Sequence, residues 1–464
     1  MSPVLETCGI IVFLLLTLVP GFYGLHLAFL AVLAHRRRKV WRADQQALVD
    51  AFVRETPDEA WPRVTTQLPL YNELAVARRI IRAAARMDYP AGRHEIQVLD
   101  DSTDETRGIV DQVCEELRAE GHDVTVFRRK DRKDYKAGAL AEALPHARGE
   151  LVAVFDADFV PDPGFLRRMV PLLARSPDAC CVQGRWGHLN PHESWITESL
   201  ALAMDGHFSV EQPARAWNGF LLNFNGTGGI WRRAAIEDPA VGGWSGDTIT
   251  EDLDLSYRAQ LAGWRVVYTP DEVCPAEIPA DIDAMKSQQR RWATGSMQTA
   301  RKLLPRVWRS RLSLVQKFEA SVHLTQYSTS IFMVLMACLG RTVLYTIPSD
   351  TQRAWLAWTW FLLPFMILAP SATYVYGRWA IGGGWSGLWH VPKLIVLGLG
   401  LSINNAYAVL LGLVQRGGEF VRTPKSGSSG RVMRQQRYSS LRSRLWLFEL
   451  GLGACCFFQW LVFL

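Results

Sequence analysis

Several common signatures of metal, phosphate and nucleic-acid binding are missing from this chain. Its eight cysteines contain no C-x-x-C spacing, so neither a cysteine zinc site nor a disulfide framework is indicated. Reduced, buried thiols are therefore expected, and they fit a central domain in the cytosol. No G-x-x-x-x-G-K-[ST] loop is present, so bound phosphates would be held by cations rather than by a glycine loop. The chain has no recognisable nucleic-acid module, and we expect no nucleic-acid partner.

The charge distribution follows the pattern of a membrane protein. The formal net charge is +6, and the basic excess lies in two clusters. One cluster, residues 35–39, directly follows an apolar run at residues 8–34, and the other has eight Lys and Arg between Gln415 and Arg444. Basic residues collect on the cytoplasmic side of membrane spans. Because the first cluster follows the apolar run, we predict a retained helix with its N-terminus outside the cell rather than a cleaved signal peptide.

Four further apolar stretches follow the central part of the chain, at residues 318–347, 355–376, 388–413 and 445–464. If all four crossed the membrane, the Arg-rich segment before the last stretch would lie outside the cell, against the positive-inside pattern. The third stretch contains Lys393 and the pair Asn404-Asn405. We therefore predict that this stretch lies at the inner surface and that the other three span.

These patterns divide the chain into three parts. We predict an N-terminal transmembrane helix over residues 1–39, a cytoplasmic domain with interfacial helices over residues 40–312 and a C-terminal transmembrane region over residues 313–464. The last part includes an interfacial segment at residues 386–414 and a basic loop at residues 415–444. The protein is expected to be a multi-pass protein of the inner (plasma) membrane with its central domain in the cytoplasm.

The central domain alternates short apolar strands with helical stretches. This alternation is typical of a parallel sheet with helices on both faces. The predicted strands are residues 64–67, 96–100, 124–127 and 151–155, and the predicted helices are residues 73–87 and 106–120. Ligands of such sheets bind at the carboxyl ends of the strands, so the polar residues after each apolar run are the candidates for chemistry.

Carboxylates occupy several of these positions. Asp100 and Asp101 end one predicted strand, and Asp156-Ala157-Asp158 follows another. Carboxylates gathered in one crevice repel each other unless a cation or hydrogen-bond donors neutralise them. Asp156 and Asp158 face the same side of an extended turn and suit Mg²⁺ or Mn²⁺, although many such pairs are plain polar loops. A further acidic cluster, Glu251-Asp252, follows Thr250.

Three further segments are candidates for binding a ligand. Lys136 precedes small residues that open a helix, where it can meet an anion, or it can simply be solvated. Asn225 to Gly229 follows the apolar run 220–224, predicted as a strand, and its glycines allow close backbone approach or a plain turn. The pentapeptide 288–292 combines an amide, Arg291 and Trp292. Arg can hold a diphosphate and Trp can stack on a sugar, whereas the alternative is a membrane-edge anchor.

Taken in order, these motifs resemble those of the processive family 2 glycosyltransferases. That family includes cellulose, hyaluronan and chitin synthases, and the resemblance is strongest to the cellulose-synthase-like glucomannan synthases. The matching segments are Leu68-Pro69-Leu70-Tyr71-Asn72-Glu73, Asp100-Asp101-Ser102, Lys136-Ala137-Gly138, Asp156-Ala157-Asp158, Asn225-Gly226-Thr227, Thr250-Glu251-Asp252 and Gln288 to Trp292. The set covers most of residues 64–300, and as an ordered set it is specific.

The resemblance implies an α/β GT-A domain followed by an α-helical transmembrane region. It implies an inverting hexosyltransferase that uses UDP-glucose or GDP-mannose with Mg²⁺ or Mn²⁺. The enzyme would extend the non-reducing end of a β-glycan and pass the polymer through the lipid bilayer, with accessory subunits or an oligomer left open.

The same resemblance assigns roles to individual residues. The nucleotide sugar would be bound by Glu73, Asp100, Asp101, Lys136, Asp156 and Arg291, and the metal by Asp158 with Asp156. Asp252 would be the general base, and the reaction would also involve Glu251, Gln288, Arg291 and Trp292. The acceptor would contact Trp292, Asn225, Thr227 and Asp252.

The basic loop near the C-terminus resembles the gating loop of this family, which has the pattern F-x-V-T-x-K. The corresponding residues are Phe420, Arg422, Thr423 and Lys425, with Arg422 where the family has Val. In that family the preceding segment is an interfacial helix, which agrees with the charge argument for residues 386–414.

Three other functions compete with a polymer synthase. A glycolipid synthase, similar to ceramide glucosyltransferase, would use the same aspartates to add one sugar to a lipid. It would need no gating loop. A channel or transporter with a cytoplasmic regulatory domain would leave the ordered carboxylates unexplained. The last alternative is a structural partner of another synthase.

Overall fold

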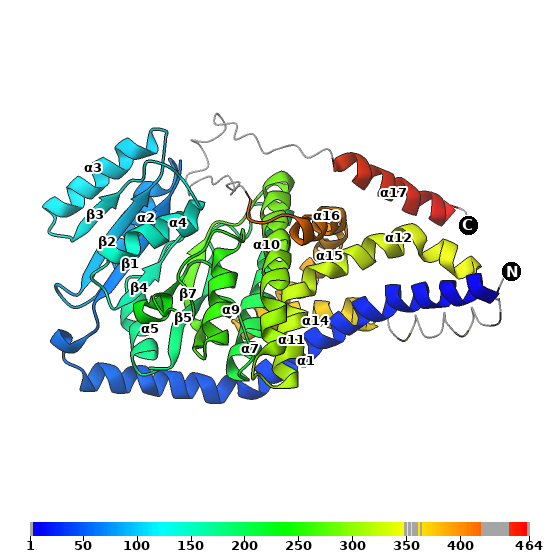
Figure 1. Ribbon diagram of the computed structural model, residues 1–464, viewed down its shortest axis with the longest axis horizontal. Helices are drawn as coiled ribbons and strands as arrows, with labels where there is room; N and C mark the ends of the chain where they lie inside the picture. Colours follow the sequence, from blue (N-terminus) through cyan, green and yellow to red (C-terminus); the bar gives the residue numbers. More distant parts are fainter. Residues whose placement is uncertain are drawn as a thin grey trace.

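The computed structural model describes residues 3–347, 350, 354, 361, 364–418 and 445–461. A sheet domain lies at one end and a group of apolar helices at the other (Figure 1). Helix α10 (Ile282–Arg309) stands between the two parts, and the long helix α1 (Pro3–Glu55) runs along both.

A seven-stranded sheet forms the centre of the sheet domain, with the strand order β3-β2-β1-β4-β6-β5-β7. The strands are β1 (Val64–Leu70), β2 (His94–Asp100), β3 (Val124–Phe127), β4 (Leu151–Val154), β5 (Ala179–His188), β6 (Gly229–Arg232) and β7 (Arg265–Ala276). The four predicted strands are confirmed and pair in parallel. The sheet as a whole is mixed, because β6, which was not predicted, runs antiparallel to both β4 and β5.

Helices cover both faces of the sheet and form its two apolar cores. One core contains Ile80, Val113 and Leu166, and the other contains Leu140 and Leu255. The helices up to α10 are η1 (Asp58–Ala60), α2 (Ala77–Ala85), α3 (Thr106–Ala119), α4 (Tyr135–Ala143), η2 (Leu144–His146), α5 (Phe165–Ala174), α6 (Trp195–Gly206), η3 (His207–Glu211), α7 (Gln212–Trp217), α8 (Arg233–Ile236) and α9 (Glu251–Leu261). Both predicted helices are present, as α2 and α3, with α2 shorter than expected.

The strand predicted at residues 220–224 is wrong. This segment is irregular, and side chains of α9 satisfy its backbone in place of a neighbouring strand. Gln260 bonds both the N–H and the C=O of Leu222, at 3.2 and 2.7 Å, and the Phe224 N–H donates to Ser256 Oγ at 2.7 Å. Buried backbone groups need partners, and here the helix supplies them.

Within the described ranges, two helices are long and apolar enough to cross a membrane, Val4–Glu55 and Leu314–Gly340. The pair Gly384–Gly400 and Ser402–Val414 also qualifies if its 47° bend lies within one span. The elements after α10 are α11 (Leu314–Thr325), η4 (Gln326–Ser328), α12 (Thr329–Tyr345), η5 (Pro364–Leu368), α14 (Ala369–Ala380), η6 (Gly384–His390), α15 (Val391–Gly400), α16 (Ser402–Val414) and α17 (Trp446–Leu461). The number of spans and their orientation stay predictions.

Helix α1 continues well past the predicted domain boundary at residue 39. Its last turns pack on the sheet domain, where Phe52 joins the apolar core and Gln45 Nε2 donates to the Tyr268 carbonyl at 3.0 Å. One helix therefore ties the first candidate span rigidly to the sheet domain.

The predicted interfacial segment lies against helices α6 and α10. Lys393 of α15 forms a 2.6 Å ion pair with Glu198 of α6, and Arg290 of α10 donates to Asn404 Oδ1 of α16 at 2.9 Å. The polar residues that set this stretch apart in the sequence thus bind the sheet domain and α10. The predicted gating residues Phe420, Arg422, Thr423 and Lys425 lie outside the described residues.

Candidate active site

The carboxyl ends of β1, β2 and β3 lie next to one another and bring acidic and basic side chains together. Arg129 binds both carboxylate oxygens of Asp101, at 3.1 and 2.5 Å. Arg128 Nε donates to Asp100 Oδ2 at 2.9 Å. Asp100 is only 1% exposed, so its carboxylate is committed to this ion pair. Asp101 still faces a cavity.

Lys136 is the centre of a second cluster at the end of β4. Its ammonium donates to Asp156 Oδ1 at 2.6 Å and to the Gly226 carbonyl at 2.9 Å, and Glu251 Oε1 lies 3.7 Å away. Burial alone lowers the pKa of Lys136, but the nearby carboxylates of Asp156 and Glu251 outweigh it and raise the pKa. Lys136 is therefore a firmly charged cation at the strand ends.

Asp252 lies in the first turn of α9, beside this cluster. Its Oδ1 accepts the Leu253 N–H at 2.8 Å. Gly226 has φ +80°, and a Cβ on it would lie 2.9 Å from Asp252 Oδ2, so this glycine lets the loop reach the carboxylate. Burial, with the charge of Glu251, raises the pKa of Asp252 to about 7, although Lys136 opposes the shift. A carboxylate of this kind can take up a proton near neutral pH.

Three residues of the pentapeptide 288–292 share one face of α10. Gln288, Arg291 and Trp292 are spaced i, i+3 and i+4, and all three line the same cavity. The Trp292 ring lies 6.4 Å from the ring of Trp186, at the end of β5. The motif therefore faces the strand ends and is not merely a membrane-edge anchor.

A first cavity of about 340 Å³ opens above the strand ends. Eight of the predicted site residues line it: Glu73, Asp101, Lys136, Asp156, Asp158, Gln288, Arg291 and Trp292. Arg132, which lies 3.2 Å over the centre of the Tyr71 ring, also lines this cavity. The size and the mixture of cations, carboxylates and aromatic rings suit a charged, sugar-containing ligand.

A second cavity of about 450 Å³ lies between the sheet domain and the apolar helices. Trp186, Leu200, Met204 and Trp292 line both cavities. The polar and aromatic residues of the second cavity include Tyr23, His26, Glu211, Arg215, Asn223, Asn225, Asp252, Gln289, His323, Tyr327, Tyr374 and Asn405. The two cavities meet at a wall that includes Trp292, and Asp252 faces the second.

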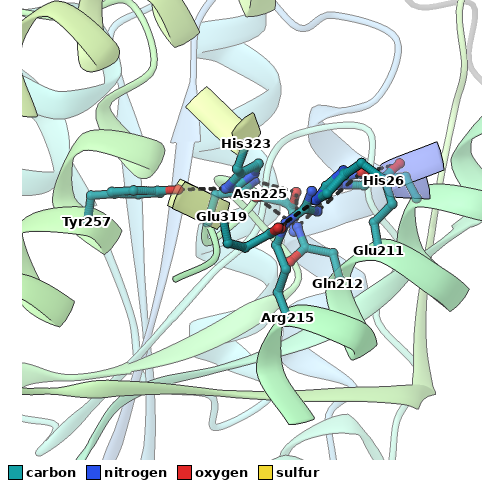
Figure 2. A network of polar contacts seen from close by, with 10 residues as sticks. His26, Glu211, Gln212, Arg215, Asn225, Tyr257, Glu319 and His323 are labelled. Carbon is teal, nitrogen blue, oxygen red and sulfur yellow. Dashed lines mark hydrogen bonds and ion pairs between the residues drawn. The ribbon is translucent and has the colours of Figure 1, made fainter. Parts of the chain in front are cut away.

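A buried network of charged groups forms one side of the second cavity (Figure 2). Glu319 of α11 pairs with His26 of α1 at 2.5 Å and with Arg215 of α7 at 3.0 Å. Arg215 also pairs with Glu211 at 3.2 Å. The network therefore joins the two candidate membrane helices to the sheet domain.

Of the predicted site residues that the structure describes, three line neither cavity. Asp100 forms an ion pair with Arg128, and Glu251 Oε1 lies 3.7 Å from Lys136 Nζ. Thr227 is fully buried, and its Oγ1 accepts the Asp156 N–H at 2.9 Å. These three residues orient or neutralise their neighbours.

Sequence reasoning missed several residues around the first cavity. Arg128 and Arg129 directly follow a correctly predicted strand, so their position at the sheet edge was a usable signal. Trp186 and His188 end β5, which was not predicted, because its irregular register and the small residues Gly184 and Gly187 weaken the strand pattern.

The acidic pair after β4 fits a divalent cation that is shared with a ligand. Among the described residues, no group of three or more His, Cys, Asp or Glu side chains could hold a metal ion. Mg²⁺ and Mn²⁺ commonly take only one or two carboxylates together with substrate phosphates. Asp156 and Asp158 both line the first cavity and so supply a donor set of that kind.

Comparisons with known proteins bear on the family of this chain. Residues 62–295 match the family model described as glycosyltransferase like family 2. Glucomannan 4-beta-mannosyltransferase 7 of Arabidopsis thaliana is 34% identical over 418 residues, which cover 87% of this chain and 72% of the relative. Glucomannan 4-beta-mannosyltransferase 1 of Oryza sativa subsp. japonica is 31% identical over 450 residues, covering 90% of this chain and 81% of the relative.

Among solved structures, the chain is similar to the mannosyltransferase PcManGT from Pyrobaculum calidifontis in complex with GDP-Man and Mn²⁺. The sequence identity is 22% and the TM-score 0.48, and the match covers 78% of this chain and 99% of that chain.

Proposed function

Since the chain belongs to glycosyltransferase family 2 and has a GT-A-like nucleotide-sugar transferase fold, we propose that it is an inverting polysaccharide synthase. It transfers a hexose from a nucleotide sugar to the non-reducing end of a growing β-glycan. One observation carries the proposal: two cavities meet at Trp292, with the phosphate-binding groups around the first and Asp252 facing the second.

The first cavity takes the nucleotide sugar. Glu73 and Asp101, near the ends of β1 and β2, line this cavity and would contact the nucleoside, whereas Lys136 and Arg291, which also line it, would contact the diphosphate. Cations hold phosphate oxygens through charge-assisted hydrogen bonds, and Arg does so through a planar fork. Asp158, with Asp156, would hold Mg²⁺ or Mn²⁺ against the diphosphate. A bound cation supplies charge stabilisation for the leaving diphosphate.

Asp252 acts as the general base. It takes the proton from an acceptor hydroxyl, whose oxygen then bonds to the anomeric carbon of the donor. The bond from that carbon to the diphosphate breaks in the same displacement, and the nucleoside diphosphate leaves. One displacement inverts the configuration, so an α-linked donor yields a β-linked product. Trp292 stacks on the acceptor sugar and holds its hydroxyl near Asp252.

Lowering the pH through about 7 is expected to reduce the rate of transfer. Burial and the charge of Glu251 raise the pKa of Asp252 to about 7, and a general base works only when it is deprotonated. The active form is therefore present above this pH and is lost below it. Initial rates at saturating donor between about pH 5.5 and 8.5 would test this. A flat profile, with donor binding unchanged, would contradict it.

The second cavity receives the acceptor chain. It extends from Asp252 and Trp292 to residues of α1, α11 and α14, which include Tyr23, Val322 and Tyr374. Aromatic and polar side chains of this kind suit a chain of sugar rings. The position of the cavity beside the candidate membrane helices supports passage of the polymer into the membrane, with the sheet domain on the cytoplasmic side.

Analysis of the reaction product would test the proposed function. Purified full-length protein is incubated with labelled GDP-mannose or UDP-glucose and with Mg²⁺ or Mn²⁺, and the linkage of the product is analysed. We expect a water-soluble or precipitating polymer with β-linkages. The names of the relatives favour mannose joined by 4-linkages. A labelled product that extracts into organic solvent would favour the glycolipid synthase, and absence of transfer from either donor would contradict the proposal.

A further inference from the structure

His188 lies in the first cavity and has no part in the mechanism above. It is the last residue of β5, and its side chain is 7% exposed. Its Nε2 lies 3.0 Å from Asp205 Oδ1 of α6. An ionised carboxylate only accepts hydrogen bonds, so Nε2 carries the proton in the neutral ring. The other nitrogen, Nδ1, is then a hydrogen-bond acceptor.

This acceptor has no partner among the described side chains and backbone groups. His188 Nδ1 is buried and has no hydrogen-bond partner in the part of the chain that the structure describes. A buried polar atom without a partner is costly, and such atoms in a binding cavity are commonly satisfied by the ligand. The cavity that His188 lines also contains Lys136 and Arg291, the residues assigned above to the diphosphate.

Two residues outside the cavity lining, Asp205 and Arg378, fix the orientation of the His188 ring. Asp205 is 1% exposed and pairs through Oδ2 with Arg378 Nε of α14 at 2.9 Å. Helices α6 and α14 approach closely enough for this pair because glycines face each other. A Cβ on Gly377 would lie 2.6 Å from the Cα of Gly206. Asp205 and Arg378 are thus positioning residues that fix the tautomer of His188.

The position of His188 in the sheet indicates which part of the ligand it meets. Ala276 of β7 pairs with His188 on one side and with Phe159, the neighbour of Asp158, on the other. Trp186 and His188 are two positions apart on β5, so their side chains face the same side of the sheet. On that side, the centre of the Trp186 ring lies 6.4 Å from the centre of the Trp292 ring. His188 therefore lies between the residues assigned to the diphosphate and the aromatic wall assigned to the acceptor. In the proposed function, the transferred hexose would occupy the space between them.

We propose that His188 Nδ1 accepts a hydrogen bond from a hydroxyl group of the hexose carried by the nucleotide sugar. This inference rests on the proposed function, since it takes the first cavity as the donor site. Sites that hydrogen-bond a substrate hydroxyl discriminate against ligands that cannot supply it. His188 is thus a residue that recognises the donor sugar.

Two amide substitutions distinguish the roles of the two ring nitrogens of His188. In His188→Asn the amide oxygen can take the place of Nδ1, whereas in His188→Gln the amide nitrogen takes the place of Nε2 and keeps the contact with Asp205. Affinities of the full-length protein for GDP-mannose and GDP, and for UDP-glucose and UDP, are measured by calorimetry with Mn²⁺ present.

We expect His188→Gln to weaken binding of the accepted nucleotide sugar by about three- to tenfold and to leave binding of its nucleoside diphosphate unchanged. His188→Asn should retain most of the sugar-dependent affinity. A deoxy-sugar donor that lacks the recognised hydroxyl should bind wild type and His188→Gln equally.

Other outcomes would overturn the inference. Equal losses for nucleotide sugar and nucleoside diphosphate would mean that His188 serves the diphosphate or the fold. Unchanged affinity for the nucleotide sugar in His188→Gln would mean that His188 does not contact the sugar. If the wild-type protein binds no nucleotide sugar, the proposed function itself fails, which is a different result from a variant that matches a binding-competent wild type.

Discussion

Asp252→Asn is expected to reduce sugar transfer by a factor of about 10² to 10⁴, the usual contribution of general base catalysis. The amide cannot take the proton of the acceptor hydroxyl, so the attacking oxygen stays a poor nucleophile. Because the pKa of Asp252 is raised to about 7, the protonated carboxyl is already a normal state of this buried site. Asparagine resembles that state in size and charge, so the variant should fold and should bind the nucleotide sugar normally.

The measurements are the initial rate of transfer and the affinity for the nucleoside diphosphate, both on the full-length protein. Asp88→Asn is a suitable control, because Asp88 is an exposed carboxylate that pairs with Arg167 at the surface. Its activity should match that of the wild type. If Asp252→Asn lost nucleotide affinity as strongly as it lost transfer, Asp252 would belong to the nucleotide or metal site instead.

Glu319→Ala is expected to lower the free energy of unfolding by about 3–5 kcal/mol, the usual cost of removing one partner from a buried ion pair. Glu319 is 2% exposed and bridges His26 of α1 and Arg215 of α7 (Figure 2). Arg215 is itself only 1% exposed, and after the substitution Glu211 would be its one remaining carboxylate among the described residues. The loss should appear as a lower midpoint of thermal unfolding in detergent.

A surface ion pair supplies the matched control. Glu237 forms a 2.8 Å ion pair with Arg233, four residues earlier in the chain, and the Glu237 side chain is 46% exposed. Glu237→Ala should cost at most about 1 kcal/mol. Glu319→Gln keeps an oxygen for Arg215 Nε and should fall between the two. If Glu319→Ala and Glu237→Ala unfolded at the same midpoint, the buried network would not hold the two candidate membrane helices to the sheet domain.

The predicted strand-end motifs lie together because their spacing follows the regular alternation of strands and helices. Asp101, Asp156 and Asp158 were expected at the carboxyl ends of strands and Lys136 at the start of a helix, and all four line the first cavity. Gln288, Arg291 and Trp292 share a face because their spacing matches one turn of a helix. Local periodicity was sufficient for these residues.

Other features depended on contacts that local patterns do not contain. The run 220–224 is as apolar as a strand, yet Gln260 and Ser256 of α9 take its backbone hydrogen bonds. Strand β5 was missed because of its irregular register, and His188 was missed with it. Asp100 and Asp101 are identical neighbours in the sequence, but only Asp101 faces the cavity.

By itself the sequence determined the order of the motifs, the α/β character of the central domain and the family, since these follow from local spacing and from residue type. Only the tertiary structure decided which acidic groups are neutralised by arginines and how strongly burial raises the pKa of Asp252. It also decided which helices enclose the second cavity. The reason is physical: burial and ion pairing act between groups that are near in space, and Asp252, Lys136 and Gly226 come from three separate segments of the chain.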